Sequence, residues 1–107
     1  MNNKEIIKYL ISNGVKPTLL GFIYLCDAIE MTIENNNIIP KSVGDLCKTI
    51  ADKYHTSKAG VTMAMRNAIA SSGGKLYNLS IATFVVNASI DISLGVWFMK
   101  VNNEKIK

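Results

Sequence analysis

The sequence predicts a compact, all-helical domain of five to six helices, and three observations lead to this class. Apolar residues recur at intervals of three and four along most of the chain, which is the spacing of one helix face. Residue types that favour helix starts and ends fall between these stretches. The 107 residues are 49% hydrophobic and 19% charged, a composition that supports one core and excludes a disordered chain. We therefore expect a single domain over residues 1–107.

Two helices are expected before residue 35. The first ends at Gly14, which suits a left-handed cap. The second is opened by Pro17 and Thr18, runs to the polar segment 34–37, and is expected to be the central helix. Its apolar stripe consists of Leu19, Phe22, Ile23, Cys26, Ile29 and Ile33.

A helix-turn-helix motif is expected over residues 42–70. Ser42 can cap its first helix, and Asp45 three residues later makes the arrangement close to a capping box. Ser57 or the residue before it can cap the second helix. Only residues 54–56 separate the two helices, and so short a gap forces the sharp turn of this motif. The expected buried positions are Val43, Leu46, Cys47, Ile50, Ala51, Val61, Met65, Ala68 and Ile69.

The crossing of these two helices needs a small residue, which Ala51 supplies. His55 falls in the tight turn, and histidine is one of the non-glycine residues enriched at positive φ. It is the only histidine in the chain and has no neighbouring motif that would make it a catalytic base. We interpret His55 as a turn residue.

The C-terminal third has a less regular pattern. Gly73-Gly74 is expected to stop the fourth helix, and a fifth helix is expected over residues 76–86 despite its β-branched cluster. Ser93 is expected to cap a last helix, which ends in the polar tail 102–107.

Several other classes of protein are disfavoured by the sequence. The apolar stretch 81–99 could reach across a bilayer, but polar residues such as Asp91 interrupt it, so a buried helical pair is expected. The N-terminus lacks the layout of a secretory signal, which favours the cytoplasm. Cys26 and Cys47 lie on apolar stripes without metal-ligand spacing and are expected to be buried thiols. No constellation for catalysis, a metal, a cofactor or a small-molecule substrate is recognisable, so no enzyme is expected.

Positive charge is concentrated in the middle of the chain. The whole chain carries +4, and residues 41–75 carry six basic and two acidic residues, so this segment alone accounts for +4. A DNA backbone favours such a concentration, because each neutralised phosphate releases condensed counterions. The alternative interpretation is a solvated helix face.

The outward face of the fourth helix has the composition of a DNA-reading surface. Once the buried positions are removed, residues 58, 62 and 66 form one row and residues 59, 63 and 67 another. Arg66 can bond a guanine edge with two hydrogen bonds, Asn67 an adenine edge, and Thr62 or Met63 can touch a thymine methyl group. The predicted DNA-binding residues are Lys53, Ser57, Lys58, Ala59, Thr62, Met63, Arg66, Asn67 and Lys75.

The sequence also resembles a known family, the C-terminal effector domain of the stage-zero sporulation response regulator, from about Ile6 to Ala70. The matching residues are Gly14-Val15, the segment 21–25, Ala28-Ile29, the segment 50–54, Val61 and the segment 66–69. The resemblance implies a six-helix fold whose third and fourth helices form the helix-turn-helix motif, the fourth reading double-stranded DNA upstream of sporulation genes. It also implies that copies bind DNA side by side, as a homodimer.

The reading face departs from that family. Where the family has Arg-Val-Glu-Arg, residues 60–63 are Gly-Val-Thr-Met, so one acidic and two basic side chains are missing, whereas Arg66 matches a recognition-helix arginine. The predicted function is a sequence-specific transcriptional regulator of the sporulation-initiation type, with helix 57–70 in the major groove. The alternative is a non-enzymatic protein-interaction module that kept the fold and lost specific DNA reading, which Gly60, Thr62 and Met63 favour.

Overall fold

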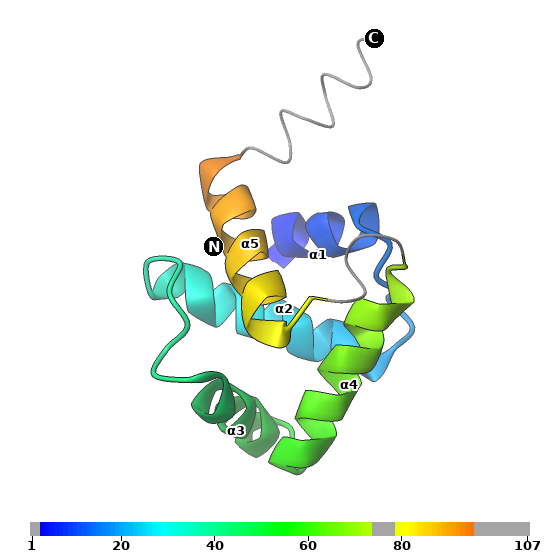
Figure 1. Ribbon diagram of the computed structural model, residues 1–107, viewed down its shortest axis with the longest axis vertical. Coiled ribbons are helices and arrows are strands. Elements are labelled where there is room, and N and C mark those ends of the chain that lie inside the picture. The colour runs from blue at the N-terminus through cyan, green and yellow to red at the C-terminus, as the bar shows by residue number, and fades with distance from the viewer. Residues whose placement is uncertain (1–2, 74–78, 96–107) are drawn as a thin grey trace, which may run out of the picture.

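The computed structural model describes residues 3–73 and 79–95, and this part of the chain consists of five α-helices and no strand (Figure 1). The helices are α1 (Asn3–Ser12), α2 (Leu20–Glu34), α3 (Val43–Lys53), α4 (Lys58–Ser71) and α5 (Ile81–Leu94). The predicted all-helical class is confirmed. Within the described residues, none of the helices has both the length and the apolar character required to cross a membrane.

The central helix is α2, against which the four other helices pack (Figure 1). The predicted stripe was right for Phe22, Cys26 and Ile29, which are buried, but wrong for Ile23, which is 47% exposed. A single stripe describes a helix covered on one side. Because α2 is covered on several sides, Leu25 and Ala28 are buried as well.

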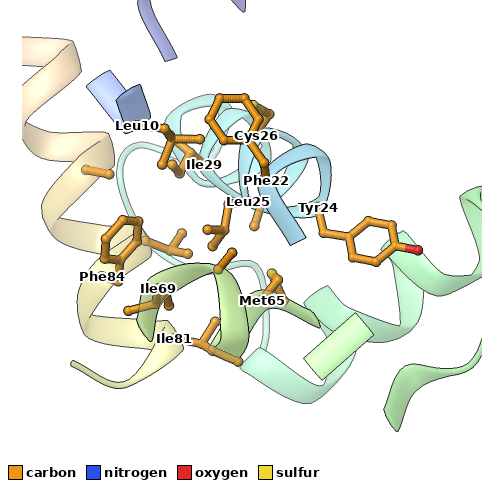
Figure 2. Close-up of a cluster of buried hydrophobic side chains, with 14 of the residues drawn as sticks. Leu10, Phe22, Tyr24, Leu25, Cys26, Ile29, Met65, Ile69, Ile81 and Phe84 are labelled. Carbon is orange, nitrogen blue, oxygen red and sulfur yellow. The ribbon is translucent and has the colours of Figure 1, made fainter. Parts of the chain in front are cut away.

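The core lies between α2, α4 and α5. Figure 2 shows Leu25 of α2 and Met65 and Ile69 of α4 within one cluster, with Phe84 of α5 beside them. Each of these four side chains is at most 2% exposed. The two cysteines are buried free thiols, as predicted.

The backbones of α2 and α4 approach closely at Gly21. A methyl group at Gly21 would overlap the carbonyl oxygen of Ala64 and lie 2.9 Å from the Cβ atom of Ala68. Glycine is therefore needed where the two backbones meet, and this contact sets the position of α4 on the core.

The start of α2 and the limits of α5 differ from the prediction. Residues 17–19 form a turn, and α2 begins at Leu20 rather than at Pro17 and Thr18. The fifth helix was expected over 76–86 but runs from Ile81 to Leu94. Its cap is Ser80, whose Oγ accepts a hydrogen bond from the Thr83 N–H at 3.1 Å.

Ser93 was expected to cap a last helix, and this prediction was wrong. Ser93 lies inside α5, where its hydroxyl donates to Oδ1 of Asn37 at 2.9 Å. The helix ends instead at Gly95, which has a φ of +69°. The expected last helix beyond Gly95, the polar tail and Lys75 lie outside the described residues.

Candidate DNA-binding face

The turn between α3 and α4 has the conformation that the sequence predicts. His55 has a φ of +55°, so the chain reverses within four residues. The Thr56 N–H donates to the Ala51 carbonyl oxygen at 2.9 Å and closes the end of α3. The first predicted helix end at Gly14 is likewise left-handed, with a φ of +83°.

Both helices of the motif begin with a serine cap. The Oγ of Ser42 accepts from the Asp45 N–H at 3.1 Å, and the Oγ of Ser57 accepts from the Gly60 N–H at 3.0 Å. These bonds satisfy N–H groups that have no partner inside a helix. The Asp45 carboxylate accepts from the Ser42 hydroxyl at 3.1 Å, so the pair only partly reproduces a capping box.

The inner face of α4 fixes the angle between the two helices. Val61 and Met65 are fully buried, and Ala51 of α3 is 2% exposed. The central helix also contacts the turn between α3 and α4. The ring centroids of Tyr24 in α2 and Tyr54 in the turn lie 5.3 Å apart, at an interplanar angle of 56°. Figure 2 shows Tyr24 pointing away from the core cluster. Packing of its inner face against α2, α3 and α5 therefore fixes α4 and leaves its outer face open.

The outer face of α4 forms an open groove that contains no acidic side chain among the described residues. It is lined by Lys58, Ala59, Thr62, Met63, Arg66 and Asn67. Six of the nine predicted site residues are thus brought together, and Ser57 caps the same helix. Met63 is the most exposed of the large apolar residues on α4, at 66%.

Three polar side chains on this face, those of Lys58, Arg66 and Asn67, form no hydrogen bond or ion pair within the described part of the chain. Arg66 and Asn67 are exposed and make no hydrogen bond or ion pair there. Thr62 differs, because its hydroxyl donates to the Lys58 carbonyl oxygen at 2.9 Å. Arg66 and Asn67 consequently keep their full donor capacity for a ligand.

The start of α5 borders this face without covering it. Arg66 and Asn67 also line a second groove, whose opposite wall is formed by residues 79–82 and whose edge includes Val43. Within the described residues, nothing occludes the two polar side chains.

Lys53 has a different environment from the residues of α4. Its ammonium lies 3.2 Å from both carboxylate oxygens of Asp27 and 5.2 Å from the ring centroid of Tyr54. The hydrogen bonds that Lys53 donates to Asp27, together with the negative charge of that carboxylate, raise the pKa of Lys53. This pair could not be predicted from the sequence, because Asp27 belongs to α2 and is 26 residues away.

The acidic residues of α2 gather elsewhere on the molecule. Asp27, Glu30 and Glu34 line a cleft between α2 and α3, together with Lys53. Burial, together with the charges of Asp27 and Glu30, raises the pKa of the Cys26 thiol to about 11. The face of α4 is therefore the basic surface of the motif, and the cleft beside α2 is acidic.

Together, the serine-capped helix pair, the sharp turn and the open basic face define a domain of the helix-turn-helix class. The chain belongs, more particularly, to the family described as sporulation initiation factor Spo0A, C terminal, which matches residues 6–89. The match extends beyond Ala70, where the resemblance read from the sequence ended, and into α5. The domain is accordingly one of the DNA-binding regulators of sporulation. No solved structure shows significant similarity to the chain.

Proposed function

We propose that this domain is a sequence-specific transcriptional regulator that inserts α4 into the major groove of double-stranded DNA. The observation that carries the proposal is that Arg66 and Asn67 are adjacent in sequence and exposed, and that their side chains have no partner among the described residues. Arginine recognises the O6 and N7 atoms of guanine with two hydrogen bonds, and asparagine recognises the N6 and N7 atoms of adenine. We therefore expect these two residues to specify neighbouring base pairs.

The remaining contacts divide by position along α4. Ser57 and Lys58 lie at the start of the helix, where phosphate contacts fix the orientation of a recognition helix. Met63 and Ala59 present methyl groups in the next row, which suits contact with thymine. Lys53 is expected to contribute less than Lys58, because Asp27 already neutralises its charge.

The preferred DNA site should differ from that of family members with a more charged reading face. Gly60, Thr62 and Met63 replace two basic side chains and one acidic side chain of the family pattern. Base recognition then rests mainly on Arg66 and Asn67, with fewer polar contacts in support. We expect two copies to bind side by side on such a site, which the stoichiometry of the complex will test.

Selection from a random duplex pool, followed by fluorescence anisotropy on the selected duplex, tests the proposal. We expect an enriched site, a tenfold or greater preference for it over a scrambled duplex, and an affinity that falls as salt rises, because phosphate contacts release counterions. Replacement of Arg66 by alanine should remove most of the preference. Lys48→Ala is the matched control. This substitution also removes one positive charge, but at a lysine of α3 that pairs with Asp52. Failure to enrich any sequence, with DNA binding absent at low salt, would contradict the proposal.

A retained protein-interaction role predicts a different result. In that case Met63 would contact another protein, and co-purification of that protein would survive nuclease treatment while the selected duplex would not bind. The same Arg66→Ala variant would leave such a complex intact.

A further inference from the structure

The side chain of Lys58 crosses from α4 to the start of α3. A methyl group placed on Gly44 would lie 2.9 Å from the Nζ atom and 3.4 Å from the Cε atom of Lys58. The side chain therefore passes directly over the second residue of α3, in space that any larger residue would occupy. The ammonium makes no hydrogen bond or ion pair with a described residue.

This position places positive charge at the positive end of a helix. The first N–H groups of α3 have no acceptor inside the helix, and the third of them, the Asp45 N–H, donates to the capping Oγ of Ser42. An ammonium beside that end is repelled by the helix dipole unless an anion lies between them. The arrangement is thus suited to a ligand that carries negative charge, and the DNA backbone supplies it.

We propose that Gly44 is a positioning residue for DNA binding. By lacking a side chain, Gly44 lets Lys58 lie across the first turn of α3, so that its ammonium donates to a phosphate at the edge of the major groove. The inference rests on the proposed function and adds to it, because it assigns a role to a residue of α3 outside the reading face.

Substitution of Gly44 should change the position of the Lys58 ammonium without destabilising the fold. In a Gly44→Ala variant, the two atoms nearest to the new methyl group would belong to the flexible end of a lysine, which moves easily, and the third would be the Ser42 Oγ at an ordinary contact distance of 3.7 Å. Alanine also has the higher helix propensity. The variant should therefore melt at the temperature of the unmodified domain or above it, while Lys58 is displaced.

A double-mutant cycle tests this with four proteins: the unmodified domain, Gly44→Ala, Lys58→Ala and the double variant. Their affinities for the selected duplex are measured by anisotropy from 50 to 300 mM salt, with thermal melting of each protein. Loss of one phosphate contact reduces the slope of log affinity against log salt by about 0.9. We expect this reduction for Lys58→Ala, a smaller reduction with roughly threefold weaker binding for Gly44→Ala, and no further loss in the double variant.

Three results would overturn the inference. Gly44→Ala could keep the affinity and the salt slope of the unmodified domain, or it could weaken binding by the same factor whether or not Lys58 is present. If the unmodified domain binds no duplex at all, the proposed function fails and this inference fails with it. Binding by the unmodified domain with no effect of Gly44→Ala refutes the inference alone.

Discussion

The two faces of α4 lie in contrasting environments, one against the core and one open to solvent. On the inner face, Val61, Met65 and Ala68 are fully buried. On the outer face, Arg66 and Asn67 are exposed and interact with no described residue. Packing therefore constrains one side of the helix, and a partner molecule is left to constrain the other. The difference predicts that stability and DNA binding can be altered separately by substitutions at adjacent positions.

The largest effect is expected for Met65→Ala, which removes a fully buried side chain from the inner face. The lost burial and the cavity left behind should lower the free energy of unfolding by about 2–5 kcal/mol. Urea denaturation followed by circular dichroism measures this change. A loss below about 1 kcal/mol would mean that α4 is not anchored by this side chain.

The neighbouring substitution, Arg66→Ala, should give the opposite pattern. Its binding free energy for the selected duplex should weaken by about 1–3 kcal/mol if Arg66 reads a base. The free energy of unfolding should change by less than about 0.5 kcal/mol, because the side chain has no partner in the described fold. Anisotropy and urea denaturation of the same preparation provide both values, and a large loss of stability would contradict the separation of the two faces.

Ser57→Ala removes the side-chain cap at the start of α4. The Gly60 N–H would lose its acceptor, which should lower the free energy of unfolding by about 1 kcal/mol. Ser57→Asp is the matched control, because aspartate also caps a helix and should retain most of the stability. Equal losses in both variants would show that the hydroxyl does not act as a cap.

The smallest effect is expected for Lys53→Ala. The pair with Asp27 is exposed on the lysine side, so its removal should cost less than about 1 kcal/mol of stability. Because Asp27 already neutralises this lysine, the salt slope of DNA binding should change less than in Lys58→Ala. A larger change for Lys53 would reverse the assignment of phosphate contacts.

The pKa of Lys53 gives the sign of one pH dependence. A lysine whose pKa is raised in the folded state contributes stability at neutral pH and loses it as pH rises through that raised value. We expect the difference in unfolding free energy between the unmodified domain and Lys53→Ala to shrink above about pH 10. Denaturation at pH 8 and at alkaline pH would measure it.

Local signals in the sequence were sufficient for the helix-turn-helix motif. Ser42 and Ser57 cap their own helices, and His55 adopts the positive φ that a short turn requires, so each could be predicted from neighbouring residues. Burial of Val61 and Met65 followed from helical periodicity in the same way.

Features that depend on distant residues could not be predicted. The limits of α5 differ from the prediction, because Ser80 caps this helix rather than lying inside it, and because Ser93 lies within α5 rather than capping another helix. The contact of Lys53 with Asp27 and that of Lys58 with Gly44 join separate helices. Neither leaves a periodic trace in the sequence.

The central claim, that the outer face of α4 meets DNA, is tested most directly by NMR titration of the isotopically labelled domain with the selected duplex. We predict that the largest amide and side-chain shifts will fall on residues 57–67, with Arg66 and Asn67 among them. We also predict that α1 and the acidic side of α2 will stay unperturbed. Shifts centred on Asp27 and Glu30, with residues 57–67 unchanged, would contradict the account.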